Sequence, residues 1–183
     1  MRLQISKIIE KIDPWDKDEL IHKNLVEKWV ASGADLFRIE KPATPNMHLV
    51  SYFVPYDKQK EKIFLVHHKK ANLWLPPGGH VDVDEHPKDA ASREMEEELF
   101  TKADFLMDDP LFLTVTKTVN NSLSHTDVSL WFVVKGNSLQ DYRFDTGEFY
   151  DAAWFKINEL PKTQMEPHLK RFLGKLQNSL SKS

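Results

Sequence analysis

The chain of 183 residues is 40% hydrophobic and 29% charged, a composition that fits one globular domain with a buried core. Its formal net charge is only −3, so no overall field favours nucleic acid or an anionic membrane surface. The absence of cysteine excludes disulfides, thiolate nucleophiles and cysteine metal ligands, and no apolar run approaches the length of a membrane span. We therefore expect a soluble, cytoplasmic protein in which any recognition of phosphate is local.

The first 40 residues are predicted to form a helical extension. Residues 2–12 and 14–32 both have helical patterns, and the second helix is expected to begin with Asp13 as N-cap and Pro14 at its first position. This extension, residues 1–40, either packs against the rest of the chain or supplies a homodimer surface or a substrate lid.

Residues 41–183 are predicted to form one α+β domain. "MHLVSYFVPY" and "EKIFLVHHKK" are apolar, β-branched or aromatic runs typical of a hairpin, and "LFLTVTKTVN" and "HTDVSLWFVVKG" alternate in period two around "NSLS" as a second hairpin. "EFYDAAWFKI" predicts a further strand, and residues 163–178 an amphipathic terminal helix. Strands, a helix, more strands and a final helix favour a mixed sheet flanked by helices.

The chemistry is concentrated in residues 75–100, "LPPGGHVDVDEHPKDAASREMEEELF". At roughly 100° per residue, Glu94, Glu97 and Glu98 fall on one side of a helix and direct three carboxylates toward one region. Such crowding is unfavourable unless a positive charge compensates it, and Mg²⁺ or Mn²⁺ prefers oxygen ligands of this kind. The opposite side of this helix is expected to be buried through Ala90, Ala91, Met95 and Leu99.

The neighbours of the acidic run favour a functional site over an ordinary solvated acidic face. Gly78 and Gly79 precede the helix and allow close approach of the backbone to a ligand. Arg93 lies beside the carboxylates, where a guanidinium can hold a carboxylate in place.

These residues resemble a known pattern, the Nudix box, G-x5-E-x7-R-E-U-x-E-E-x-G-U with U aliphatic. Gly79, Glu85 and the run from Arg93 to Glu98 match it at fixed spacings. Phe100 and Thr101 depart from it, since they replace the glycine and the aliphatic residue. Because Phe tolerates a left-handed helix cap poorly, we expect the helix to end differently from the family pattern, running on through Lys102.

The resemblance implies a Nudix-like α/β/α sandwich and a metal-dependent hydrolase. It implies that Glu94, Glu97 and Glu98 are catalytic metal ligands, together with the carbonyl of Gly78, and that Arg93 and Glu85 are catalytic residues that orient them. The implied cofactor is Mg²⁺ or Mn²⁺, and the implied partner is a nucleotide-type small molecule.

The general base stays open between a glutamate of the box, Glu148 and Asp151, since both of the latter lie in the acidic segment "EFYDAAWF". Substrate contacts are predicted for Gly79, His80 and Lys70, each with packing or solvation as the alternative. Weaker candidates for substrate contact are His67, His68, Lys69, His125 and Asp127, and for base stacking Trp131, Phe132 and Trp154, for which a core position is favoured.

The leading hypothesis is hydrolysis of the diphosphate linkage in a nucleoside diphosphate joined to another group, of the ADP-ribose, sugar-nucleotide or dinucleotide type. The alternative within enzymes is a nucleoside triphosphate pyrophosphohydrolase acting on normal or oxidised nucleotides. The alternative of another class is a non-catalytic nucleotide-binding module.

Overall fold

The computed structural model describes residues 1–41, 43–118, 124–162 and 164–182. The chain forms two compact units. The first comprises Met1–Tyr52, Gly79–Ala91 and Asp109–Phe132, and the second comprises Phe53–Gly78, Ser92–Asp108 and Val133–Ser183. The predicted boundary at residue 40 stays a prediction. The elements are α1 Arg2–Lys11, α2 Lys17–Ala31, β1 Met47–Asp57, β2 Lys62–His68, β3 Leu73–Leu75, β4 Gly78–His80, α3 Pro87–Leu99, β5 Phe112–Thr118, β6 His125–Lys135, β7 Phe149–Lys156 and α4 Leu169–Ser181.

Both predicted hairpins are confirmed. Hydrogen bonding orders the strands β3-β2-β1-β6-β5, with β4 paired to β1 and β7 paired to β2. β1 and β2 pair antiparallel, as do β5 and β6. Most of the "NSLS" loop predicted between β5 and β6 lies outside the described residues.

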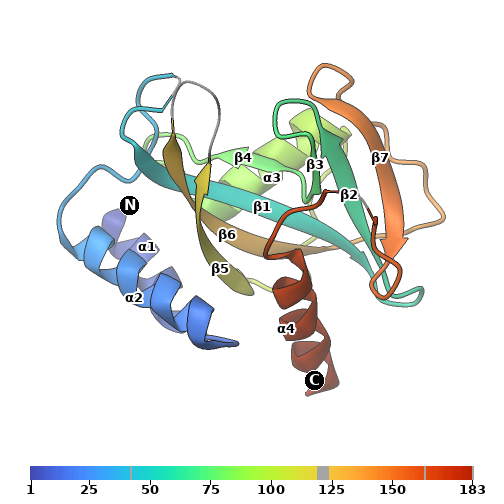
Figure 1. Ribbon diagram of the computed structural model, residues 1–183, viewed down its shortest axis with the longest axis horizontal. Coiled ribbons are helices and arrows are strands. Elements are labelled where there is room, and N and C mark those ends of the chain that lie inside the picture. The colour runs from blue at the N-terminus through green and yellow to red at the C-terminus, as the bar shows by residue number, and fades with distance from the viewer. Residues whose placement is uncertain (42, 119–123, 163, 183) are drawn as a thin grey trace. The chain divides into compact units, whose positions relative to one another are not determined.

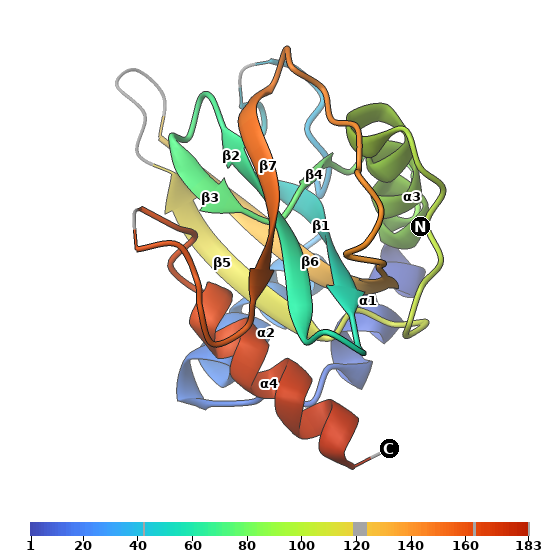
Figure 2. The ribbon, with the colours of Figure 1, turned by 90° about the vertical axis from the view of Figure 1, so that its right-hand side faces the viewer.

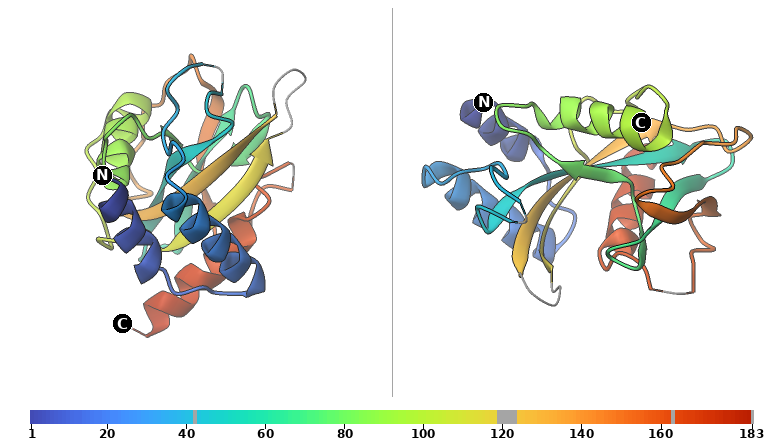
Figure 3. Two further views of the ribbon diagram at one scale, coloured as in Figure 1. Left: turned by 90° about the vertical axis from the view of Figure 1, so that its left-hand side faces the viewer. Right: turned by 90° about the horizontal axis from the view of Figure 1, so that it is seen from above.

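In the first unit, α2 packs on β5 and α1 packs on α2. α1 and α2 lie side by side, and α2 contacts β5 (Figures 1 and 3). The carboxylate of Glu19, completely buried, accepts the backbone N–H of Leu113 on β5 at 3.1 Å and that of Trp15 at 2.7 Å. This side chain therefore joins α2 to β5 through hydrogen bonds that water cannot replace.

The predicted start of the second helix is wrong. α2 begins at Lys17, and Asp16 is its N-cap, accepting the backbone N–H of Glu19 at 2.8 Å. Asp16 and Glu19 have the spacing of a capping box, and this pair fixes the helix start in preference to Asp13 and Pro14.

In the second unit, β2 lies between β3 and β7 (Figure 2). β2 and β7 pair antiparallel from Lys62↔Lys156 to His68↔Phe149. Gly136 allows the close approach of a strand side chain, since a Cβ there would come within 2.4 Å of the Trp154 ring.

The terminal helix begins later than predicted, at Leu169 instead of residue 163. Glu166 donates its N–H to the carbonyl of Trp74 at 2.8 Å, and Pro167 disfavours helical geometry in the residue before it. Residues Gln164 to Glu166 therefore run along β3 at Trp74, and the helix begins only at Leu169. Thr163 lies outside the described residues.

The expected end of the acidic helix is also wrong. α3 stops at Leu99, and Phe100 adopts the left-handed region with φ 52°. Its ring is half exposed and lies under the guanidinium of Arg143, 5.0 Å from the centroid. Phe100 thus takes the cap conformation that glycine takes more easily, with a cation–π contact in partial compensation.

No helix in the described part of the chain is both long and apolar enough to cross a membrane.

We predict that Phe100→Gly is more stable than Phe100→Ala by about 1 kcal/mol. Both substitutions remove the ring contact with Arg143, whereas only glycine relieves the positive φ. Urea unfolding of the two variants at one pH measures the difference. Equal midpoints would show that the left-handed conformation carries no strain in solution.

Glu166 predicts a pH-dependent stability. Its side chain is 6% exposed, and burial raises its pKa from 4.5 to about 8, opposed in part by the backbone N–H of His168. The stabilisation of the folded state by the protonated form is therefore complete below pH 4.5 and is lost as the pH rises through about 8. Relative to Glu166→Gln, the wild type should lose on the order of 4 kcal/mol of unfolding free energy between pH 4.5 and 9.

Denaturant unfolding across that range tests this, with exposed Glu159→Gln as the matched control. Parallel curves for wild type and Glu166→Gln would contradict the prediction.

Candidate active site

The carboxylate of Glu98 is the buried centre of the site. The residue is 4% exposed, and its Oε2 accepts the backbone N–H of Gly78 at 2.8 Å. Gly78 has φ 141°, a backbone conformation that residues with a Cβ rarely adopt. The glycine therefore serves a specific purpose, which is to turn its amide toward the end of α3.

Arg93 holds the other two predicted carboxylates. Its Nη1 lies 2.8 Å from Oε1 of Glu94 and 3.3 Å from Oε2 of Glu97. The Glu94 side chain is 14% exposed and that of Glu97 is 59% exposed, so the acidic side chains of α3 range from buried to open. A single guanidinium thus restrains both side chains, as expected for an orienting residue.

Burial and neighbouring carboxylates raise the pKa values of Glu98 and Glu94. Burial is the largest cause for Glu98, whose pKa lies well above its usual value, and the charges of Glu94 and Glu148 raise it further. Burial also raises the pKa of Glu94, while Arg93 opposes this effect. A divalent cation bound by these oxygens would offset the crowding, so the donor set fits the hard metal ions that the sequence predicts.

A cavity of about 310 Å³ brings Glu148 and Lys70 together. His68, Lys69, Asp145 and Gly147 complete its lining. Glu148 is close enough to the acidic end of α3 for its charge to raise the pKa values of Glu94 and Glu98. The cavity therefore places cationic side chains and a carboxylate in one pocket of the second unit.

Of the two general-base candidates that follow the Nudix box in the sequence, Glu148 is better placed than Asp151. Asp151 pairs opposite His67 within the β2–β7 ladder, is exposed, and accepts the backbone N–H of Ala152. Glu148 lines the cavity instead. The role of general base stays a prediction for either residue.

Sequence reasoning missed Asp145. Its backbone N–H donates to the carbonyl of Glu98 at 2.8 Å, and its charge helps to raise the pKa of Glu98. The one available signal was an acidic residue three positions before Glu148 in a turn-forming "DTGE" segment, which does not indicate contact with α3.

A larger cavity of about 580 Å³ in the second unit contains none of the predicted residues. Residues of α4 and of the segment before it form its lining, among them Met165, Lys170 and Gln177. None of the described residues that line it carries a carboxylate, so we assign the chemistry to the smaller cavity.

Glu85, Gly79 and His80 belong to the first unit. Glu85 accepts the backbone N–H of Asp82 at 3.0 Å and closes the loop before α3.

His80 lies on β4 with Gly79, and its Nε2 is 3.2 Å from Nη1 of Arg38. Burial, followed by the charge of Arg38, lowers the pKa of His80 to about 3, so its imidazole is neutral at physiological pH. The predicted orienting and substrate contacts of Glu85, Gly79 and His80 stay predictions.

The aromatic candidates lie mainly in the core. Trp131 and Phe132 are at most 1% exposed, and Trp131 donates its indole N–H to Thr114 at 3.0 Å. Trp154 packs edge-on against Phe64. These positions agree with the favoured core interpretation rather than with base stacking.

The acidic cluster on α3 and the cationic cavity beside Glu148 are typical of enzymes that hydrolyse phosphoric anhydrides. The family model described as the NUDIX domain matches residues 47–176, and the chain belongs to this family. It is therefore a Nudix-type pyrophosphohydrolase, from a family that uses divalent metals and acts on nucleotide-type substrates. A comparison with curated protein sequences found no match.

Solved Nudix structures share the fold. A MutT NUDIX hydrolase from Burkholderia pseudomallei is 20% identical with TM-score 0.54, covering 71% of this chain and 98% of its own. A NUDIX-family hydrolase from Clostridium perfringens is 22% identical with TM-score 0.56, covering 72% and 97%. An Ap4A hydrolase from C. elegans is 18% identical with TM-score 0.55, covering 75% and 98%. The predicted α/β/α sandwich with a mixed sheet is thereby confirmed.

We predict that Glu98→Gln weakens metal binding while stabilising the metal-free protein. The pKa of Glu98 is raised in the folded state, so the ionised form opposes folding increasingly as the pH rises above its usual value, and a neutral amide removes this cost. Mn²⁺ affinity should fall about 10-fold or more, whereas unfolding in EDTA at pH 8 should require more urea than for wild type.

Glu96→Gln on the exposed side of α3 is the matched control. If Glu98→Gln binds Mn²⁺ as tightly as wild type does, Glu98 is not a metal ligand.

Proposed function

We propose that the protein hydrolyses the diphosphate linkage of a nucleoside diphosphate joined to another group, of the ADP-ribose, sugar-nucleotide or dinucleotide type. The observation that supports this most directly is the buried Glu98 carboxylate, held by the amide of Gly78 among Glu94, Glu148 and Asp145. An acidic cluster beside a cavity with two lysines suits a substrate whose phosphates bind through both metal ions and ammonium groups.

Glu94, Glu97, Glu98 and the carbonyl of Gly78 would hold Mg²⁺ or Mn²⁺. When bound, the metal would supply neutralisation of the diphosphate charge and acidification of a water molecule. Arg93 keeps Glu94 and Glu97 restrained through its two ion pairs.

Glu148 accepts the proton of the attacking water in this scheme. It lines the same cavity as the lysines, and its backbone carbonyl accepts the N–H of Lys69 at 2.9 Å, which fixes the loop relative to the end of β2. Lys70 contacts a phosphate oxygen, whereas the ammonium of Lys69 donates to the carbonyl of Thr146 at 2.6 Å. The shared lining of Glu148 and Lys70 supports a base and a cation acting on the same bound substrate.

Product analysis tests the proposal. The full chain is incubated with Mg²⁺ or Mn²⁺ and a panel of ADP-ribose, sugar nucleotides, Ap4A, and normal and oxidised nucleoside triphosphates. We expect a nucleoside monophosphate and a second phosphorylated product from a diphosphate-linked substrate. Release of inorganic pyrophosphate from triphosphates alone would favour the triphosphate pyrophosphohydrolase instead. Nucleotide binding without turnover under every metal would favour a binding module.

Glu97→Gln is predicted to lower kcat on the order of 100-fold, because it removes a charged ligand from the reacting centre. The measurement is steady-state hydrolysis of the best substrate in the panel. Glu96→Gln, one residue away and exposed, should keep wild-type kcat. Wild-type rates in Glu97→Gln would refute the assignment of this carboxylate.

A further inference from the structure

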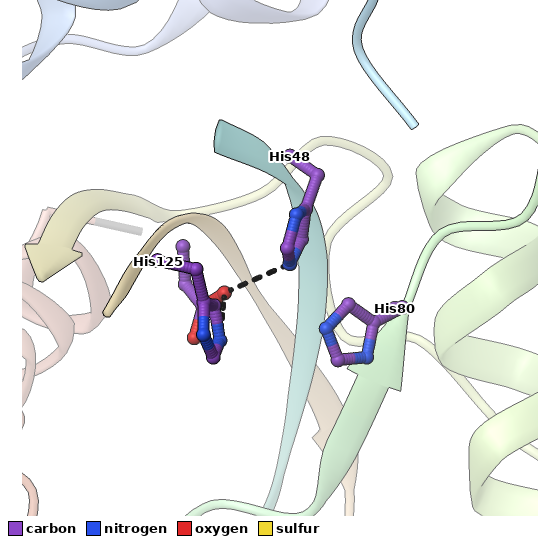
Figure 4. A group of neighbouring side chains, drawn as sticks. His48, His80 and His125 are labelled. Carbon is purple, nitrogen blue, oxygen red and sulfur yellow. Dashed lines mark ion pairs between the residues drawn. The ribbon is translucent and has the colours of Figure 1, made fainter. Parts of the chain in front are cut away.

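A second cluster of ligand-type side chains lies in the first unit. His48 on β1, His80 on β4, and His125 and Asp127 on β6 each offer one donor atom, and these atoms lie within 4.8 Å of one another. Figure 4 shows the imidazoles of His48, His80 and His125 close to one another. Nε2 of His48 and Nε2 of His125 each lie 3.3 Å from Oδ1 of Asp127. The Nudix chemistry described above makes no use of this group as a whole.

The central observation concerns His48, whose side chain is completely buried. Its Nδ1 lies 2.9 Å from the carbonyl oxygen of Pro45. Because a carbonyl can only accept, Nδ1 carries the proton, and Nε2 of the neutral ring carries a lone pair. That Nε2 lies 3.3 Å from Oδ1 of Asp127, which is also an acceptor.

Two acceptors therefore face each other away from water. Within the described residues, Nε2 of His48 and Oδ1 of Asp127 are both buried and have no hydrogen-bond partner. Nε2 of His125 lies at 3.3 Å from the same oxygen. Buried polar atoms in native proteins nearly always have a partner, so this arrangement requires an electron-pair acceptor between them.

A proton shared by His48 and Asp127 would pair only two of the four donor groups that meet here. A metal cation accepts lone pairs from several donors at once. The stacked ring of His125, 5.2 Å from the His48 centroid, and the ring of His80, at 4.8 Å, bring two further imidazoles to the same point.

We propose that His48, His80, His125 and Asp127 form a second metal site, for a borderline divalent transition metal such as Zn²⁺. Three imidazoles and one carboxylate match the nitrogen and oxygen ligands and the coordination number of four that Zn²⁺ favours. The carbonyl of Pro45 fixes the tautomer of His48, as hydrogen-bond partners of metal-binding histidines commonly do. Mg²⁺, which prefers oxygen ligands, would be a poor occupant.

Arg38 allows a second test, in which a substitution is expected to strengthen metal binding instead of weakening it. Its Nη1 lies 3.2 Å from Nε2 of His80, so a guanidinium adjoins the ligand set and opposes a cation there. His80 can act as a ligand through Nε2 only when Arg38 turns away. Arg38→Gln should therefore strengthen metal binding several-fold.

The experiment is a titration of the metal-stripped full chain with Zn²⁺, and with Co²⁺ as a spectroscopic probe, in excess Mg²⁺ to occupy the α3 carboxylates. We expect one tightly bound Zn²⁺ per chain, a rise in Tm, and the visible absorption of four-coordinate Co²⁺. His125→Gln and Asp127→Asn, neither completely buried, should each lower the affinity at least 10-fold. His67→Gln, which removes a histidine of the second unit, should leave it unchanged.

Absence of Zn²⁺ binding in the wild type overturns the proposal, as does equal affinity in His125→Gln and His67→Gln. Repeating the titration in Glu97→Gln separates the two sites. Retained Co²⁺ absorption in this variant, whose kcat is expected to be lowered, would establish a site independent of the proposed function, whereas its loss would assign the bound metal to α3.

Discussion

The burial of Glu98 is the constraint on which the catalytic arrangement depends. The apolar side of α3 is buried to within 1% exposure at Ala90, Ala91, Met95 and Leu99, which fixes the rotation of the helix. Glu98 immediately precedes Leu99, so the packing that buries Leu99 also buries Glu98. An ionised group at such a depth needs compensating partners, and the structure supplies the amide of Gly78.

The local part of this site could be predicted from the sequence because it depends on short, fixed spacings. Three carboxylates and an arginine within six residues of one helix converge whatever the rest of the fold does. Period-two alternation likewise predicts the two hairpins. Asp145 and His48 could not be found in this way, since each reaches its cluster through contacts between elements far apart in the chain.

The errors at helix ends have a common physical origin. Propensity rules predict an N-cap at Asp13 and a continued helix through Phe100, yet hydrogen bonding and packing decide otherwise. The Asp16 and Glu19 pair both caps α2 and anchors it to β5, so tertiary contact selects the later start. At Phe100, the backbone strain of about 1–2 kcal/mol is small compared with the free energy gained by burying the apolar side of α3.

In the proposed function, the distribution of charge around the cavity links metal binding to substrate binding. The formal net charge of −3 is small, but Glu94, Glu98, Glu148 and Asp145 concentrate negative charge beside the cavity. A diphosphate entering this region alone would be repelled, and the lysines at the cavity wall offset only part of that field. Under the proposed function, a bound divalent cation would cancel the negative charge that the lysines leave, so each ligand would raise the affinity of the protein for the other. The same crowding that opposes folding in the metal-free protein would then make substrate binding depend on the metal.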